Sequence, residues 1–502
     1  MSFAMFAADA TTSGGPSSDT SKGPPMSESN PLETNEISSK KSSALGLTRR
    51  TVVATAAWSV PAIMVAQSAS AAQVSCFPTG TLFQARARGR LLSGFLGGVN
   101  LDNVAGLQGE FALVPDQGTP EVTRFGTTSV TALNTVQINA TGLTGALSTL
   151  LSVAAPSGVG ALDQYARANI NGSVRGAAGA VDNQGQLELN SASATFPDFG
   201  TIDLRRILTG IGAPAAGLVG QVTDLRLQIG AVTGRAILDS TCIAGIENLQ
   251  RDYQVTRLNL VAASPLLGTV VTLVGNTLDL LAGIALTTGT TITVDRTAVF
   301  AGNLPGAGQP IQAQLGVTPA TITIDLLSLL GPAPGQPGNT PFGTYSAYFN
   351  SLPPNSTLFV DNNVALPAGA VAGFTTALVA ALLSRLQDNI RINGTPLRTA
   401  TGTAAGLVNA ALNTLLTVTL VPTLGLIQTA LLTPLFSALS TLINIDVNAQ
   451  NRSTNPPGPV VWDSLPVGRY DVAAIYIRAL GVVNLLDLFI ARGSVGENIP
   501  QP

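Results

Sequence analysis

The sequence predicts a mainly β, α+β protein: an antiparallel β framework with inserted apolar helices. Two periodicities carry this prediction. Several segments rich in Val, Ile and Thr alternate polar with apolar residues, as half-buried antiparallel strands do. Other segments repeat Leu, Val and Ala every three to four residues, as the buried face of a helix does. The 502 residues are 45% hydrophobic and only 11% charged, so the chain is too apolar to be disordered throughout.

The N-terminus predicts an export leader. Residues 1–48 are mostly Ser, Thr, Pro, Gly and charge, and we expect them to be a disordered n-region. Arg49 and Arg50 precede an uncharged stretch, and Ala69-Ser-Ala71 provides a small-residue cleavage site. We therefore predict a twin-arginine-like signal peptide over residues 49–71, cleaved after Ala71.

Two alternatives to this leader stay open. An uncleaved membrane anchor is one, although Pro61 and the cleavage site argue against it. A different start is the other, because Met26 would begin a leader of more usual length. The C-terminus shows no sorting signal of the Leu-Pro-x-Thr-Gly type, so we expect no covalent wall anchor there.

The remaining chain divides into a β-rich region over 72–250 and an α+β region over 251–502, which could also form one continuous domain. The predicted strands are Leu82 to Leu91, Gln186 to Ala194, Thr223 to Ala236, Tyr253 to Ala262, Thr290 to Asp295 and Tyr470 to Leu480. The predicted helices are Leu266 to Leu286, Ala370 to Leu386, and a pair joined near Pro422 with a kink at Pro434.

The helical pair lies in a run of 47 residues without charge, between Arg398 and Asp446. Such a run must be weighed as a membrane hairpin. Gly, Pro, Asn and Thr are spread through it, and Arg398 is its only basic flank. We therefore expect these helices to line a protein core or a groove rather than to span a membrane.

A weak internal repeat is visible. Thr201-Ile-Asp-Leu and Thr323-Ile-Asp-Leu both open Leu-rich segments, and Thr293-Val-Asp295 echoes their start. Duplicated units of a strand followed by a helix would explain the repeat, and so would coincidence in a chain rich in Leu and Thr. Residues 331–341 hold four prolines and three glycines, which predicts a loop or linker.

The absence of two residue types excludes much chemistry. The chain has no His, and its three Lys all lie in the leader. Five basic and five acidic residues belong to residues 1–71, which leaves 20 arginines and 23 acids. Catalysis by a His base, His-ligated metal sites, Schiff bases and Lys isopeptide bonds are therefore excluded after cleavage. Paired carboxylates remain, as in glycoside hydrolysis.

Most acids have simpler interpretations. Asp203, Asp224, Asp325 and Asp446 are expected at strand ends or in turns, where Asp satisfies local backbone groups. Asp182-Asn-Gln-Gly and Asp361-Asn-Asn contain oxygen ligands suited to calcium, but turns account for both. We predict no catalytic, cofactor-binding or metal site.

Nucleic acid is not an expected partner, because the chain after the leader is slightly acidic. Arg86, Arg88 and Arg90 alternate on one strand face, but three charges make only a small patch.

Cys76 and Cys242 are the only cysteines, and both follow the leader. Their even number and the oxidising compartment predict one disulfide that closes a loop with 165 residues between the two positions.

Several short motifs occur in a recognisable order: Leu92-Ser-Gly, Val99-Asn-Leu-Asp-Asn103, Asp163-Gln-Tyr-Ala-Arg-Ala-Asn169, Gly172-Ser, Ala177-Ala-Gly-Ala-Val-Asp182, Ala479-Leu-Gly and Ser494-Val-Gly-Glu-Asn498. Together they resemble the choice-of-anchor G family of secreted actinobacterial surface proteins, over nearly all of residues 80–498. The resemblance implies export and display at the cell surface, with members differing in how, or whether, they are anchored. It implies no known enzymatic activity and supplies no binding residues.

The sequence therefore leads to a secreted, non-enzymatic protein of the cell surface of a Gram-positive actinobacterium, with a structural or adhesive role. Cell-wall or surface components are the expected partners. An extracellular carrier of lipid or another apolar ligand is the main alternative, because long uncharged helices beside a sheet can enclose an apolar cavity. A glycoside hydrolase that uses two carboxylates is the third hypothesis.

Overall fold

The computed structural model describes residues 77–502 except 129–130, 139–142, 154–161, 188, 190–197, 244–245, 284–288, 307, 452–467 and 483. The described residues all fall within one compact unit, Ala66–Pro502. Every pairing between the named strands is antiparallel, as the sequence predicts.

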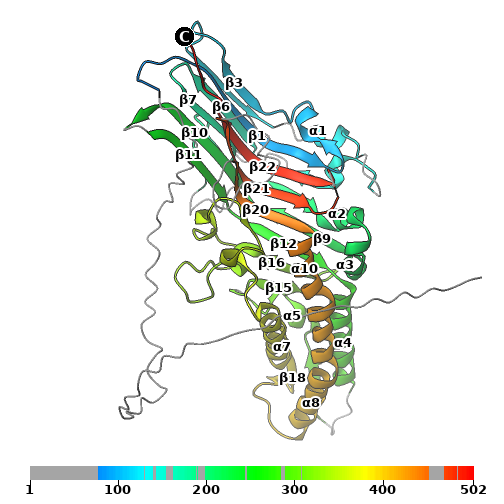
Figure 1. Cartoon of the computed structure of the whole chain (residues 1–502). Helices are drawn as coiled ribbons and strands as arrows, with labels where there is room; N and C mark the ends of the chain where they lie inside the picture. The colour runs from blue at the N-terminus through cyan, green and yellow to red at the C-terminus, as the bar shows by residue number, and fades with distance from the viewer. Residues whose placement is uncertain are drawn as a thin grey trace, which may run out of the picture. The chain divides into compact units, whose positions relative to one another are not determined.

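The largest sheet brings the two ends of the described chain together. Its main order is β17-β20-β21-β22-β1-β2, and β3 and β23 also pair with β1. In Figure 1 the blue strand β1 lies beside the red strand β22, and their register runs from Ala87↔Val495 to Leu96↔Leu486. The strands are β1 Phe83–Leu96, β2 Val99–Asn100, β3 Glu110–Val114, β17 Ser356–Thr357, β20 Ile443–Gln450, β21 Tyr470–Ala479, β22 Leu486–Val495 and β23 Ile499–Pro500.

A five-stranded sheet packs directly on β1 and β22. Its order is β11-β10-β7-β6-β4, with β4 Glu121–Thr127, β6 Asp163–Asn169, β7 Ser173–Gly179, β10 Val232–Ile243 and β11 Ile246–Val255. The two layers touch through glycines. A Cβ atom on Gly176 of β7 would lie 2.4 Å from the carbonyl oxygens of Arg88 and Ser494, and one on Gly493 of β22 would lie 2.4 Å from the Gly176 oxygen. These positions therefore require glycine for the close approach of the two backbones.

A seven-stranded sheet continues the β framework in the order β14-β15-β16-β12-β9-β8-β5. Its strands are β5 Leu151–Val153, β8 Gly200–Asp203, β9 Asp224–Ile229, β12 Leu258–Ala263, β14 Asn303–Leu304, β15 Ile311–Gln314 and β16 Thr321–Asp325. The predicted strand Thr223 to Ala236 is in fact the whole of β9 and the start of β10. Similarly, Tyr253 to Ala262 covers the end of β11 and most of β12.

The internal repeat is a unit of strand, aspartate and helix. β8 leads into α2 Leu204–Ile211, β16 into α6 Leu326–Leu329, and β13 Ile292–Val294 into α5 Arg296–Phe300. In each case the aspartate between them caps the helix: Asp203, Asp295 and Asp325 accept backbone N–H groups at 2.9, 2.9 and 3.0 Å. This confirms the interpretation as strand-then-helix units, since Asp at the N-cap satisfies amides that the first turn leaves unpaired.

Three long helical segments lie side by side in Figure 1: α4 Pro265–Ala282, α7 Ala370–Asn389 and a continuous helix over Thr403–Thr441. A small sheet of β13, β18 Ile390–Ile392 and β19 Thr395–Pro396 follows the end of α7. The short helices α1 Ala132–Thr135 and α3 Ala216–Gln221 lie elsewhere in the chain. The helices predicted from Leu266 and Ala370 are thus confirmed.

The prediction of two helices joined near Pro422 is wrong. The helix runs without a break through α8 Thr403–Thr414, a π-helical stretch at Leu415–Leu420, α9 Val421–Leu426, a second π-helical stretch at Ile427–Leu432, and α10 Thr433–Thr441. Pro422 and Pro434 each lie near the start of the α-helical segment after a π stretch. The wider π turns accommodate rings that lack an N–H donor, so the prolines do not end the helix.

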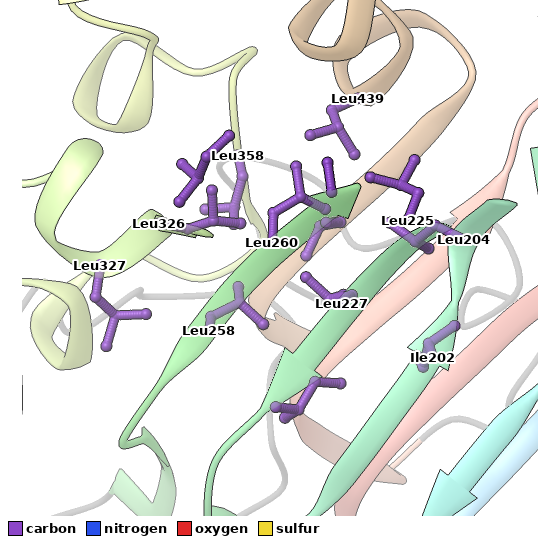
Figure 2. Packing of buried hydrophobic residues seen from close by; sticks show 14 of the residues in the cluster. Ile202, Leu204, Leu225, Leu227, Leu258, Leu260, Leu326, Leu327, Leu358 and Leu439 are labelled. Carbon is purple, nitrogen blue, oxygen red and sulfur yellow. The ribbon is translucent and has the colours of Figure 1, made fainter. Parts of the chain in front are cut away.

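The main core runs through the three large sheets, and one part of it lies where helices cover the seven-stranded sheet. Figure 2 shows Leu439 of α10 and Leu358 close to Leu225, Leu258 and Leu260 of β9 and β12, all of them buried. Residues 331–341 form a loop without helix or strand, as predicted. The predicted strand at Gln186 to Ala194 lies mostly outside the described residues.

Candidate functional site

The most concentrated polar chemistry in the described structure lies on β20, β21 and β22. The register places Asp446 opposite Tyr476, Tyr476 opposite Phe489, and Arg478 opposite Asp487. Further along, Asp471 lies opposite Ser494, and Arg492 lies between Ala473 of β21 and Arg90 of β1. We call these residues the polar face of the large sheet.

Asp471 is the centre of the first half of the polar face. Its side chain is fully buried and accepts hydrogen bonds from two arginines: Arg492 Nε at 2.8 Å and Arg469 Nε at 3.1 Å. Its own backbone N–H donates to Asn451 Oδ1 at 2.7 Å. Burial by itself would raise the pKa of Asp471, but the charges of Arg492 and Arg469 outweigh it and hold the pKa below its ordinary value. Asp471 is therefore an ionised carboxylate enclosed by cations.

The second half of the polar face joins two carboxylates to a stacked aromatic pair. The rings of Tyr476 and Phe489 stack with centroids 4.1 Å apart. Thr357 Oγ1 donates to Asp446, and Arg478 Nη2 lies 3.6 Å from the same carboxylate. Burial raises the pKa of Asp446 and that of Asp487, and it also raises the pKa of Tyr476, which hydrogen-bonds to Asp487.

One cation–π contact links the halves, and another lies within the second half. The guanidinium of Arg492 lies 5.0 Å from the Phe489 ring centroid, and that of Arg478 lies 5.5 Å from the Tyr476 ring. Chemically, Asp446 and Asp487 are the pair that comes nearest to the acid–base carboxylates of a hydrolase, because a raised pKa suits a general acid. Asp446 is however only 2% exposed and is already bonded to Thr357 and Arg478. The arrangement therefore stabilises the sheet, and access to its carboxylates is limited.

A separate open cavity of about 610 Å³ lies between α4, α5 and β15. Its lining is mainly apolar and small, with Val271, Gly275, Phe300 and Val317 beside the polar groups of Arg296 and Gln314. Arg296 Nη1 also donates to Asp279 at 2.9 Å. A cavity of this kind can accept an apolar ligand and provides one cation near it.

The acids that the sequence singles out have mostly local roles. Asp203 and Asp325 cap helices, and Asp224 pairs with the exposed Arg226 at 2.9 Å. Asp182 Oδ1 accepts the N–H groups of Gln184 and Gln186, which confirms a turn. The expected place of Asp446 at a strand end or turn is wrong, because it lies in the middle of β20 and bonds across to β17 and β21.

Asp361 also serves the backbone, since its Oδ2 accepts the N–H of Thr357 at 2.8 Å. In the part of the chain that the structure describes, no cluster of three or more His, Cys, Asp or Glu side chains could hold a metal ion.

The three alternating arginines of β1 are each engaged. Arg86 pairs with Glu497, Arg88 donates to the Gln108 carbonyl, and Arg90 pairs with Asp102 at 2.7 Å. Burial lowers the pKa of Arg88 to about 10, with the charge of Arg90 adding to the effect.

The predicted leader residues Arg49, Arg50, Ala69 and Ala71 lie outside the described residues, and so do Cys76 and the side chain of Cys242. The backbone next to both cysteines is described, however. Phe77 and Thr241 form a parallel bridge, and each is the chain neighbour of one cysteine. The disulfide remains a prediction.

Asp471, Arg492, Tyr476 and Asp487 are functional-site residues that no motif in the sequence marks. The available signal was a charge within an apolar strand: Asp471 opens the run Val-Ala-Ala-Ile, and Arg492 follows Leu-Phe-Ile-Ala. A charge in such a run must find a partner if both faces of the strand are buried.

Comparison with known protein families shows which family the chain belongs to. The chain belongs to the family of the domain of unknown function DUF8394, matched over residues 87–340. The DUF8394 match extends from β1 to the loop after α6, which includes α4 and the three strand–aspartate–helix units. It leaves out α7, the long helix and β20 to β22, so the large sheet combines β1 of DUF8394 with later strands. No curated protein and no solved structure matches the chain.

Proposed function

We propose that this protein is a secreted, non-enzymatic protein of an actinobacterial cell surface, with a structural or adhesive role. The leader supports export, since Arg49 and Arg50 precede an apolar segment and the Ala69-Ser-Ala71 site. The order of short motifs over residues 80–498 supports membership of the choice-of-anchor G family.

The proposal that the protein is not an enzyme is supported by its buried carboxylates, which are engaged in contacts that hold the fold together. Asp471 is held by Arg492 and Arg469, Asp325 by the backbone N–H groups of Leu327, Ser328 and Gly343, and Asp446 by Thr357 and Arg478. Each of these carboxylates joins segments of the fold, so a reaction would have to break a structural contact. A scaffold of paired sheets tied in this way suits a protein that bears load or presents a surface.

Replacing Arg49 and Arg50 by Lys tests the export step. We expect precursor to accumulate in the cytoplasm, while the unchanged chain yields a product that begins at residue 72 and is degraded when intact cells are treated with protease. Double Arg→Lys replacement at Arg205 and Arg206, outside the leader, is the matched control. Normal secretion of the leader variant would reject the twin-arginine assignment.

A carrier of an apolar ligand is the second candidate, and the cavity beside α4 favours it. Native mass spectrometry of the secreted protein tests it: a copurifying acyl chain supports the carrier. Val317→Asp places a charge in the cavity lining and should remove the ligand, whereas Val360→Asp, at an exposed position outside that lining, should not. If the unchanged protein and the Val360→Asp variant are both free of ligand, the structural role is favoured.

The hydrolase hypothesis is tested by screening the secreted protein against cell-wall glycans. If activity is found, Asp446→Asn and Asp487→Asn should abolish it, since these are the two carboxylates whose pKa values are raised on one face. Activity that survives both changes would place the reaction elsewhere.

A further inference from the structure

The three long helical segments have lengths and compositions suited to a bilayer. Pro265–Ala282, Ala370–Asn389 and Thr403–Thr441 each contain a window apolar enough to cross a membrane. Only 33%, 28% and 39% of these windows is buried within the protein. The long helix contacts both α4 and α7, and the three lie side by side in Figure 1; we call them the helical bundle.

The outward side of the bundle is apolar and uncharged where a water-facing helix normally carries charge. Val418 is 69% exposed and Leu280 74%, and Leu407, Val421 and Leu426 are each at least half exposed. The exposed neighbours along the long helix are mainly Thr, Asn, Ala, Pro and Ser. The long helix has no charged residue from Thr403 to Thr441. The sequence-based expectation that these helices line a core or groove therefore holds for only one side of each helix.

Several threonines on this surface use their hydroxyl donors within the helix. Thr417 and Thr429 of the long helix donate to the carbonyls of Asn413 and Gly425, and Thr272 of α4 donates to that of Gly268, at 2.8, 2.9 and 2.9 Å. Such bonding to the carbonyl four residues earlier satisfies the hydroxyl within the helix. Threonine can then face hydrocarbon without leaving a donor unpaired.

Charge and amide groups gather at one end of the bundle. The ion pairs Asp279–Arg296 and Asp388–Arg398, at 2.9 and 2.6 Å, lie where α4 and α7 end and the long helix is about to begin. The exposed Asn409 and Asn413 lie in the first turns of that helix. From residue 415 to 433 the helix has no charge and no Asn, and its one amide side chain is the half-buried Gln428. At the α-helical rise of 1.5 Å per residue this part is at most about 28 Å long, since its π-helical turns rise less. That length matches the hydrocarbon core of a bilayer, about 30 Å.

We propose that a lipid bilayer covers the helical bundle, with the uncharged middle of the three helices in hydrocarbon and the charged end in water or among headgroups. A second copy of the chain explains the surface less well, because it would cover one strip while uncharged residues face outward on all three helices. The inference is independent of the structural or adhesive role. It would give the protein a non-covalent attachment to a lipid surface.

Flotation of the full secreted protein with phosphatidylcholine vesicles tests the proposal. We expect the protein to float with vesicles, and to do so equally at low and high salt, because no net charge on the protein is needed. Val418→Lys together with Leu426→Lys should reduce the floating fraction at least tenfold. Ile499→Lys, a change at an exposed apolar position on β23, is the matched control and should float like the unchanged protein.

Both helix positions are exposed in the protein alone, so the variants should keep their circular dichroism and melting temperature. Failure of the folded, unchanged protein to float overturns the proposal. So does flotation that high salt abolishes, which would indicate attraction through the charged end. A stable dimer in the absence of lipid, dissociated by the double variant while vesicle binding is absent, would assign the surface to a second copy instead.

Discussion

The polar face of the large sheet and the outer side of the helical bundle reverse the usual distribution of side chains. On β21 and β22, Asp471 and Arg492 are charged and buried, whereas Val418 and Leu426 on the long helix are apolar and exposed. Polarity alone therefore does not decide which side of a strand or helix is covered. A charge can be buried when the opposite charge is built beside it, and an apolar face can be exposed when its covering is not part of the chain.

Removing the central carboxylate of the polar face should have the largest effect. Asp471→Ala leaves Arg492, itself only 8% exposed, without its carboxylate partner, and we expect a loss of about 3–5 kcal/mol in the free energy of unfolding. Urea denaturation of both proteins measures it. Asp224→Ala, which breaks the exposed pair with Arg226, should cost less than about 1 kcal/mol. Equal losses would mean that the buried cluster contributes nothing beyond a surface pair.

The predicted disulfide should come next. Cys76→Ser with Cys242→Ser removes a cross-link over a loop of 165 residues, and we expect a loss of about 2–4 kcal/mol and a lower melting temperature. Alkylation of the denatured secreted protein checks the bond directly: no thiol should react before reduction and two after it. Two labelled thiols without reduction would show that the bond does not exist. The bridge between Phe77 and Thr241, the chain neighbours of the two cysteines, would then form without it.

Packing of the two sheets gives a third, smaller effect. Gly493→Ala would place a Cβ atom 2.4 Å from the Gly176 carbonyl oxygen, so the layers must separate. We expect a loss of about 1–3 kcal/mol, measured by thermal unfolding. Gly217→Ala in α3 has nothing within 4 Å of the new Cβ and should stabilise by about 0.5–1 kcal/mol instead. The same sign for both changes would contradict the close approach.

The smallest expected effect is on pH dependence. Burial raises the pKa of Asp446 and of Asp487, so the folded state binds more protons than the unfolded one between their ordinary pKa near 3.8 and the raised folded value. Stability from these groups is therefore present at low pH and falls as pH rises through that window. Asp487→Asn should flatten this part of the melting-temperature profile. An unchanged slope would mean that Asp487 does not titrate in this range.

Asp471 acts in the opposite direction. Its pKa is lowered because Arg492 and Arg469 outweigh burial, so its stabilisation is present above the ordinary pKa and is lost as pH falls through the folded value. In an acid titration the stability contributed by Asp471 should therefore fall with decreasing pH, whereas that contributed by Asp446 and Asp487 should rise.

Local features of the sequence determined much of the fold. Alternation over residues 82–91 and 470–480 specified β1 and β21, and spacing of three to four residues specified α4 and α7. The same spacing showed that Thr403–Thr441 is helical but not that the helix continues through Pro422. The recurrence of Ile-Asp-Leu at two places, with Val-Asp at a third, indicated units of a strand followed by a helix, and the aspartates cap the helices because capping needs only the N–H groups two or three residues later. These features depend on neighbours within about one turn or one strand, which is why they can be read from the chain.

Tertiary structure alone decided the candidate site and the two unusual surfaces. Pairing of β21 with β22 places Arg492 beside Asp471 and Phe489 opposite Tyr476. Pairing of β22 with β1 joins residues about 400 positions apart and brings Ser93 to Arg492. The need for glycine at 176 and 493 arises from two backbones meeting across layers. The helical pattern likewise identifies an apolar face but not what covers it, because burial is set by the elements that pack around a helix, and around this bundle they cover only one side.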